Sequence, residues 1–287
     1  MISFFIACMR WMSGWPLSRV RAVGSALGWL LWCTARSRRH IVLTNLRLCM
    51  PDVSHAERLA LARAHFRLVG QSLMDRAWLW HAPESVVCSR LRWCGGPQAL
   101  DAAQPVVMFA PHFVGLDAGG SAVAMHAKQP VAFIYVTQSN PQLDAWVRQG
   151  RERWGRVKPY FRHEGIRKII VGLKRGERLH LSPDMDLGPE DSIFVPFMGV
   201  NAATVPSLSR MAKLVGAKVV PVLTRLTAQG YDVEVGEPWV NFPSDDAQAD
   251  TARMNALLAQ YIAVDPAQYY WVHKRFKTRP EGEPRLY

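Results

Sequence analysis

After the Gly-Gly-Pro break at residues 95–97, short apolar segments alternate with segments of helical periodicity, and this alternation limits the possible folds most strongly. The apolar segments resemble buried β-strands and occupy residues 105–109, 131–137, 178–181, 218–226 and 231–235. Helices are predicted between them over residues 116–127, 141–154, 165–175 and 205–215, and a last helix over residues 246–263. Alternating strands and helices are typical of a mostly parallel sheet with helices on its faces. The sequence therefore predicts an α/β fold with an open, mostly parallel sheet.

The N-terminal part of the chain is predicted to be helical. Ser54 and Glu57 form a capping box, and apolar residues follow at three- and four-residue spacing until Pro83. Residues 22–35 carry no charge but are flanked by arginines, and a bilayer span needs roughly 20 apolar residues. We therefore expect a helix that lies in or dips into the membrane interface, the alternative being an amphipathic helix packed on the domain. These signals divide the chain into an N-terminal membrane-associated helix, residues 1–36, and one α/β domain, residues 37–287.

The charge of the chain favours an anionic partner. Lys and Arg number 35 against 23 Asp and Glu, which gives a formal net charge of +12. A field of this sign attracts nucleic acid, a phospholipid surface, an acidic carrier protein or a phosphorylated substrate. Charge alone does not choose among these classes.

The cysteines indicate neither a zinc site nor a disulfide framework. There are five, an odd number, and they are scattered without a C-x-x-C pair. A reducing environment that faces the cytoplasm fits this pattern best.

The stretch MFAPHFVGLDAGG, residues 108–120, is the strongest candidate for chemistry. His112 is placed where a predicted strand turns into a helix, and this is where α/β proteins expose reactive groups. A carboxylate from Asp117 could fix the tautomer of the imidazole, so that its other nitrogen could accept a proton from a hydroxyl. Neither Ser nor Cys lies within the motif, which favours direct attack by the substrate over a covalent enzyme intermediate. From spacing alone, a structural histidine remains the other interpretation.

The chain resembles the late acyltransferases of lipid A biosynthesis, the lauroyl and myristoyl transferases, from about residue 36 to its C-terminus. Besides the HFVGLD core, the matching stretches are 45–51 (NLRLCMP), 140–144 (NPQLD), 150–153 (GRER), 173–177 (LKRGE), 182–188 (SPDMDLG), 194–199 (FVPFMG), 202–204 (AAT) and 268–280 (QYYWVHKRFKTRP). So many blocks in the same order are very unlikely to arise by coincidence.

The resemblance implies a glycerolipid-acyltransferase-like fold and a metal-free acyl transfer with no cofactor. The acyl donor would be a thioester on acyl carrier protein, and the acceptor would be a hydroxyl of a phosphorylated glycolipid, the lipid A precursor. His112 would be the general base and Asp117 its orienting partner. Arg151 or Arg153 could hold the phosphopantetheine phosphate or the thioester oxyanion, or both could lie on a solvated helix face. The enzyme would work on a membrane surface, at the cytoplasmic face of a bacterial inner membrane, without nucleic acid.

The remaining candidate residues allow more than one interpretation. Asp184 and Asp186 form a D-x-D that could hold a divalent cation in a glycosyltransferase, but we assign them to shaping the acyltransferase site. Phe194 and Phe197 fit the wall of an acyl groove and ordinary core equally well. Acyl transfer to another glycolipid and a membrane-bound scaffold without chemistry also remain open, although a scaffold leaves His112 unexplained.

Overall fold

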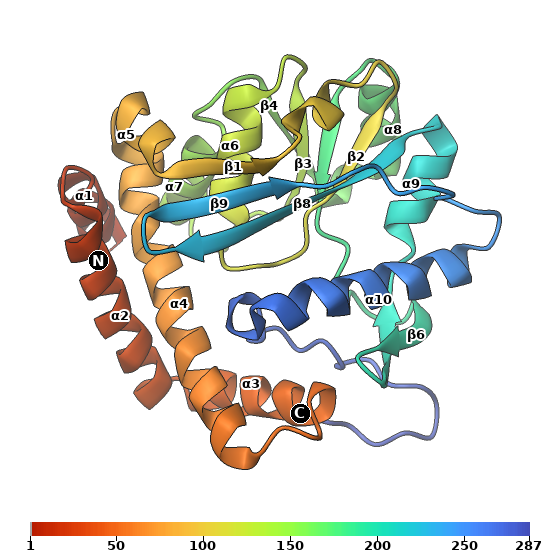
Figure 1. Ribbon diagram of the computed structural model, residues 1–287, viewed down its shortest axis with the longest axis horizontal. Helices are drawn as coiled ribbons and strands as arrows, with labels where there is room; N and C mark the ends of the chain where they lie inside the picture. The colour runs from red at the N-terminus through yellow and green to blue at the C-terminus, as the bar shows by residue number, and fades with distance from the viewer. Residues whose placement is uncertain (1) are drawn as a thin grey trace.

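A seven-stranded sheet forms the centre of the computed structural model, which describes residues 2–287 (Figure 1). Its strands are β1 (Leu91–Gly95), β2 (Val106–Phe109), β3 (Val131–Tyr135), β4 (Val157–Phe161), β5 (Arg178–Leu181), β8 (Lys218–Thr227) and β9 (Gly230–Val235). Their order is β1-β9-β8-β2-β5-β3-β4, and neighbours are parallel except for β8 and β9. The predicted mostly parallel sheet is confirmed. The remaining strands, β6 (Ile193–Phe197) and β7 (Val200–Thr204), pair as a separate antiparallel hairpin.

Helices cover both faces of this sheet, and strand β2 shows why its sequence is apolar throughout. The helices of this part are α6 (Leu116–His126), α7 (Pro141–Arg151), α8 (Ile166–Lys174), α9 (Ser207–Val215) and α10 (Ala247–Val264). Successive strand residues point to opposite faces. Val106 and Met108 pack in one core cluster with residues of α6, whereas Val107 and Phe109 pack in another with residues of α8, α9 and α10. A strand that is buried on both faces has a continuous run of apolar residues in its sequence.

The N-terminal part is helical, as predicted, but residues 2–34 form two helices and not one. The N-terminal elements are α1 (Ile2–Met12), α2 (Leu17–Thr34), α3 (Arg36–Cys49), α4 (His55–His81) and α5 (Glu84–Ser89). The predicted capping box begins α4, because Ser54 Oγ accepts from the Glu57 N–H and the Glu57 carboxylate accepts from the Ser54 N–H. Within residues 2–287, no helix combines the length and the apolar character that crossing a bilayer requires. Short 3₁₀ segments complete the fold: η1 (Pro97–Asp101), η2 (Arg162–Glu164) and η3 (Pro266–Gln268).

Helix α2 lies along α4 at very short range (Figure 1). Glycines make this approach possible: a Cβ on Gly28 would lie 2.4 Å from Phe66 O, and a Cβ on Gly70 would lie 2.2 Å from Gly24 O. Small residues at four-residue spacing let two helix backbones meet in this way. The contact makes α2 part of the packed structure, because Val20 of α2 shares a core cluster with Met74 and Trp78 of α4.

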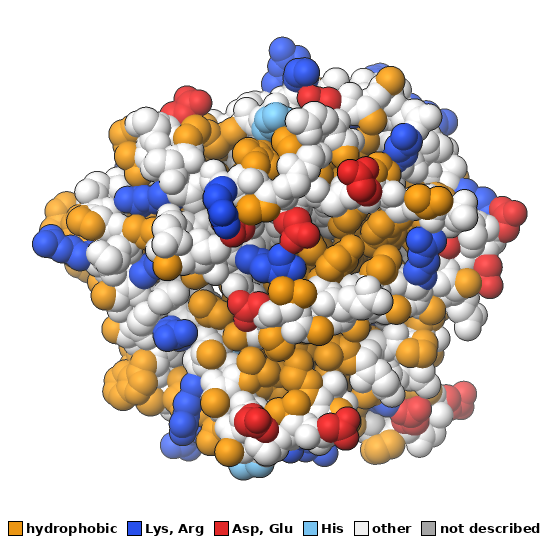
Figure 2. Space-filling model, viewed as in Figure 1, with side chains coloured by type: hydrophobic (Ala, Val, Ile, Leu, Met, Phe, Trp, Pro, Cys, Tyr) orange, Lys and Arg blue, Asp and Glu red, His pale blue; other side chains and the backbone are white. Residues whose placement is uncertain are grey.

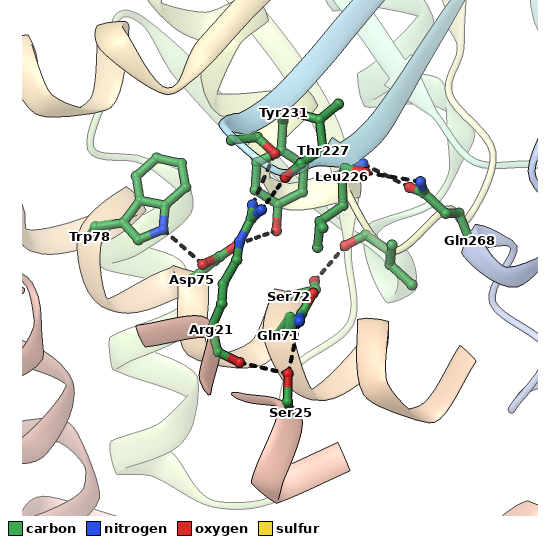
Figure 3. Close-up of polar contacts among 12 residues, drawn as sticks. Arg21, Ser25, Gln71, Ser72, Asp75, Trp78, Leu226, Thr227, Tyr231 and Gln268 are labelled. Atoms are coloured by element: carbon green, nitrogen blue, oxygen red, sulfur yellow. Dashed lines mark hydrogen bonds and ion pairs between the residues drawn. The ribbon is translucent and has the colours of Figure 1, made fainter. Parts of the chain in front are cut away.

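A buried ion pair fixes α2 to α4 and to the β8–β9 turn (Figure 3). Arg21 Nη2 lies 3.0 Å from Asp75 Oδ2 and donates to Gly230 O at 2.9 Å. The Asp75 carboxylate also accepts from Tyr231 Oη and from Trp78 Nε1, both at 2.9 Å. Asp75 is only 1% exposed, so its charge depends on these partners rather than on water. The pair therefore joins three segments that are distant in the sequence.

His65 of α4 gives the fold an acid-sensitive point. Its Nδ1 lies 2.9 Å from Ala267 O in η3, and complete burial lowers its pKa to about 4. Below its ordinary value of 6.5 the unfolded chain takes up a proton that the folded chain cannot, so acidification destabilises the fold until about pH 4. In His65→Asn the side-chain amide can still donate to Ala267 O. Between pH 7.5 and pH 5 we expect the free energy of unfolding of the wild type to fall by about 2 kcal/mol more than that of His65→Asn. Urea unfolding at both pH values measures this, and equal losses in the two proteins would contradict it.

Candidate active site

The register of two parallel strands brings His112 and Asp184 together. Phe109 at the end of β2 pairs with Leu181 at the end of β5. His112 and Asp184 each follow three residues later, and the Ala110 N–H extends the pairing by donating to Leu181 O at 2.8 Å. Carboxyl ends of parallel strands meet at one edge of a sheet, where α/β proteins place their sites. The strand-to-helix position predicted for His112 is confirmed.

The His112 ring contacts the Asp184 carboxylate. Nδ1 lies 2.8 Å from Asp184 Oδ1, and the His112 backbone N–H donates to Oδ2 at 3.0 Å. Burial alone would raise the pKa of Asp184, but the charge and hydrogen bonds of His112 and the charge of Arg275 bring that pKa below its usual value. Asp184 is therefore an ionised carboxylate on Nδ1, which leaves Nε2 as the nitrogen that a substrate can use.

A cavity of about 960 Å³ lies against His112. Its polar lining includes His112, Asp117, Arg151 and His180. Apolar side chains from several elements make up much of the rest: Leu116, Val131, Phe133, Ile134, Phe161, Ile166, Ile169, Met185, Leu187 and Met211. An apolar cavity of this size with a few convergent polar groups is typical of a small-molecule or lipid-chain site.

Asp117 does not contact the His112 ring in the way that the sequence predicted. Its Oδ1 accepts from Arg151 Nε and its Oδ2 accepts from Arg76 Nε, each at 2.9 Å. Burial alone would raise the pKa of Asp117, but the two guanidinium groups bring it far below its usual range. The H-x4-D spacing correctly placed Asp117 in the first turn of α6, but spacing along the chain does not show which helices pack against that turn. The carboxylate of the histidine pair is thus Asp184.

The two predicted arginines have different surroundings. Arg151, at the end of α7, lines the cavity and contacts Asp117. Arg153 stacks on Trp154 at 4.0 Å and donates to the carbonyls of Leu79 and Ala82, which end α4. Last-turn carbonyls lack helical partners, so a guanidinium there stabilises the helix end. Of the residues described, Arg153 is not one that lines the cavity, so the geometry gives its predicted substrate role no support.

This difference predicts different effects for two neighbouring substitutions. Arg151→Gln is expected to lower kcat by about 10²-fold or more, because it removes the guanidinium that pairs with Asp117 in the cavity wall. Arg153→Gln is expected to keep kcat within about threefold and to lower the free energy of unfolding by about 1–2 kcal/mol through the lost helix-end bonds. Steady-state kinetics and urea unfolding of both variants measure the contrast. Similar losses of kcat in both would show that the assignment is wrong.

Asp186, Phe194 and Phe197 have structural surroundings. Asp186 accepts from the backbone N–H and hydroxyl of Thr278 at 2.6 and 2.8 Å, and its own N–H donates to His273 Nε2 at 3.0 Å. Phe197 is buried against Tyr269 and Phe276, whereas Phe194 of β6 is partly exposed. As described over residues 2–287, the lining of the cavity includes none of these three side chains. The structure thus places Asp186 where it anchors the C-terminal tail, Phe197 in the core and Phe194 on the hairpin surface, and the predicted contacts of all three with a substrate stay predictions.

Asp184 and Asp186 do not have the arrangement of a metal-binding D-x-D. Each carboxylate has its own protein partners, His112 for one and Thr278 for the other. Over the described part of the chain, no three His, Cys, Asp or Glu side chains are grouped so that they could hold a metal ion. The geometry gives the glycosyltransferase interpretation no support.

The C-terminal tail and α4 hold the loop that carries His112. Phe113 forms an antiparallel bridge with Tyr269, and the Tyr270 N–H donates to His112 O at 2.8 Å. The Val114 N–H donates to Gln268 O at 2.9 Å, and the Ser72 hydroxyl of α4 donates to Val114 O. A loop bonded on both sides holds its side chains in a fixed direction, which a general base requires.

Two further residues of the site escaped the sequence analysis. His180 of β5 lines the cavity, and burial, followed by the charge of Arg151, lowers its pKa to about 4, so it is neutral at pH 7. Arg76 comes from α4, a helix distant in sequence from Asp117. For His180 a signal existed, because it lies one residue before the end of a predicted strand. For Arg76 the sequence offered none.

Residues 1–278 of the chain match the family described as the bacterial lipid A biosynthesis acyltransferases. A lipid A biosynthesis lauroyltransferase of Escherichia coli is 32% identical over 95% of this chain and 90% of the relative. A palmitoleoyltransferase of the same organism is 33% identical over 92% and 87%, and a myristoyltransferase is 30% identical over 88% and 79%.

Among solved structures, similarity is found to a 1-acyl-sn-glycerophosphate acyltransferase from Thermotoga maritima. The TM-score is 0.40 and the identity 12%, over 84% of this chain and 94% of that one. The family match spans nearly the whole chain, and the three relatives are named as acyltransferases. The chain therefore belongs to the bacterial lipid A biosynthesis acyltransferases, and it is an O-acyltransferase.

Proposed function

We propose that the protein transfers a fatty acyl chain from a thioester on acyl carrier protein to a hydroxyl of a lipid A precursor, with His112 as the general base. The observation that carries this proposal is the His112–Asp184 pair at a largely apolar cavity, with Nδ1 bound at 2.8 Å. A hydroxyl is a poor nucleophile until a base removes its proton, and Nε2 of a carboxylate-paired imidazole is suited to this task.

The reaction follows from these groups in two steps. His112 Nε2 takes the proton of the acceptor hydroxyl as its oxygen forms a bond to the thioester carbonyl carbon. Asp184 stabilises the resulting imidazolium. The carbonyl oxygen becomes an oxyanion, and we assign its stabilisation to the Arg151 guanidinium in the cavity lining. When the intermediate collapses, the carbon–sulfur bond breaks, and the leaving thiolate takes the proton from His112. The products are an ester and the free carrier thiol, with no acyl-enzyme.

Charge and surface composition support the two substrates. Acyl carrier protein is acidic and the acceptor is phosphorylated, and a net charge of +12 favours both. The apolar lining offers a place for the donor's hydrocarbon chain. Apolar side chains also reach the surface in the middle of the face drawn in Figure 2, with charged side chains around them. Apolar patches of this kind on a solvent-exposed surface are typical of binding sites for lipid or protein.

The N-terminal helices support work at a membrane surface, which we propose to be the cytoplasmic face of the inner membrane. Phe4 and Trp11 of α1 and Trp29 and Leu30 of α2 are exposed, and the arginines Arg10 and Arg19 lie among them on the same two helices. Aromatic and aliphatic side chains next to cations are typical of helices that lie in an anionic lipid interface.

A reconstituted reaction tests the function. Purified protein, lauroyl acyl carrier protein and a tetraacylated, bisphosphorylated glucosamine disaccharide are expected to give a product heavier by one lauroyl group in mass spectrometry. The reaction is expected to continue in EDTA, whereas a D-x-D glycosyltransferase would stop. If the protein is active with an acylated glycolipid of another class and inactive with this disaccharide, the acceptor is wrong. Failure to transfer to any hydroxylated glycolipid would contradict the proposal as a whole.

A further inference from the structure

One carboxylate in the cavity wall is shared by two arginines. Arg151 places both Nε and Nη2 at 2.9 Å from Asp117 Oδ1. Arg76 places Nε at 2.9 Å and Nη2 at 2.6 Å from Asp117 Oδ2. Each oxygen therefore has one guanidinium, and each guanidinium uses the same edge. The two cations therefore hold the carboxylate by both of its oxygens, in charge-assisted contacts.

The cluster carries one positive charge more than it neutralises. Asp117 contributes one negative charge, Arg76 and Arg151 contribute two positive charges, and the neighbouring His180 is neutral at pH 7. Arg151 uses two of its five N–H donors on Asp117, so its remaining donors can serve a ligand of the cavity. A partly buried surplus cation at a cavity wall favours one anionic group, such as a developing oxyanion.

Arg76 lies behind Asp117, next to a second hollow and, of the residues described, not among those in the lining of the main cavity. Its guanidinium lies 5.0 Å from the ring centre of Trp80, and it borders an apolar hollow formed with Ile2, Phe5, Leu73, Leu143 and Trp146. In the described part of the molecule, Arg76 does not belong to the lining of the main cavity. Asp117 is therefore the residue of the cavity lining that Arg76 contacts directly.

We propose that Arg76 is a positioning residue that fixes Asp117 and, through it, holds the Arg151 guanidinium toward the reacting carbonyl. This inference rests on the proposed acyl transfer for its kinetic consequence. Without Arg76, Asp117 Oδ2 loses its charged partner and the carboxylate can rotate. Arg151 is then the sole cation paired with Asp117, the cluster becomes neutral, and the guanidinium follows the carboxylate instead of facing the cavity. The oxyanion loses stabilisation, while the apolar contacts that bind the donor chain stay intact.

The test compares Arg76→Gln and Arg76→Lys with Arg90→Gln in the full-length protein. Arg90 is a matched control, because its guanidinium also stacks on a tryptophan of α4, Trp78 at 5.1 Å, and it bonds to Trp15 O rather than to Asp117. With lauroyl acyl carrier protein as donor, Arg76→Gln is expected to lower kcat by about 10- to 100-fold and to leave KM for the donor within about twofold. Arg76→Lys is expected to recover part of the loss, and Arg90→Gln is expected to stay near wild type.

A second readout does not depend on activity. In ¹⁵N-labelled protein, the Nε–H of Arg151 is expected to exchange slowly with water in the wild type and in Arg90→Gln, and rapidly in Arg76→Gln. A kcat of Arg76→Gln within about twofold of wild type would overturn the inference and leave the proposed function in place. If the wild type transfers no acyl group, the proposed function fails and the exchange experiment decides alone: an unchanged Arg151 signal in Arg76→Gln overturns the positioning role, and a lost signal supports it.

Discussion

Replacing His112 with alanine is expected to lower kcat for acyl transfer by about 10²- to 10⁴-fold, because the hydroxyl then attacks without a base. The side chain is one-quarter exposed at the cavity and is not a core residue, so the fold is expected to stay intact. Initial rates with the carrier-protein thioester measure the loss, and thermal unfolding serves as the control. Retention of more than one-tenth of wild-type turnover, in a preparation free of wild-type enzyme, would remove His112 from the role of base.

Two carboxylate variants then separate the partner of His112 from its neighbour in sequence. Asp184→Asn is expected to disturb the tautomer of the ring and to lower kcat by about 10²-fold or more. Asp117→Asn is also expected to slow transfer strongly, but through Arg151 and with the His112–Asp184 pair unchanged. The ¹⁵N chemical shifts of the His112 ring report the tautomer directly. A change in Asp117→Asn together with none in Asp184→Asn would restore the pairing first expected from the sequence.

The second large effect concerns stability. Arg21→Met is expected to lower the free energy of unfolding by about 3–5 kcal/mol, because it leaves the Asp75 carboxylate buried without a cation. Lys213→Met is the matched control, since it removes an ion pair of similar length whose partner, Asp245, is fully exposed. Such a surface pair contributes about 0–1 kcal/mol. Urea unfolding at pH 7.5 measures both variants.

The test is the difference between the free energies of unfolding that Arg21→Met and Lys213→Met each lose. If Arg21→Met and Lys213→Met unfold at the same urea concentration, the buried pair does not stabilise the fold. The double variant Arg21→Met/Asp75→Leu provides a further check: it removes both charges, so it is expected to recover much of the stability that Arg21→Met loses.

The central strands could be predicted from the sequence because both of their faces are buried. β2, β5 and β8 are buried over most of their length, and the strand prediction for each agrees with the structure within one residue. The missed strands β1 and β4 are the two edges of the sheet. Edge strands need not be apolar on both sides, so Arg92 in β1 and Lys158 and Pro159 in β4 hid the pattern. Pro196 hid β6 in the same way.

The candidate site was predictable only where it depends on local sequence. His112 follows a buried strand directly, and that position can be recognised along the chain. Its contact with Asp184 depends on the pairing of β2 with β5, strands that two others separate in sequence. The surroundings of Asp117 depend on α4, a helix that precedes the whole sheet. Partners that come from tertiary packing leave no signal in residue spacing.

The glycine contact between α2 and α4 has a practical consequence for protein engineering. Proteins are often shortened at the N-terminus to obtain a fragment that is easier to purify. Removing residues 1–35 from this chain would expose the surface of α4 around Gly70 that α2 covers. It would also remove Arg21, which among the residues described is the only arginine that forms an ion pair with Asp75. Such a fragment is expected to aggregate during expression, so purification is better served by a chain that keeps residues 1–35.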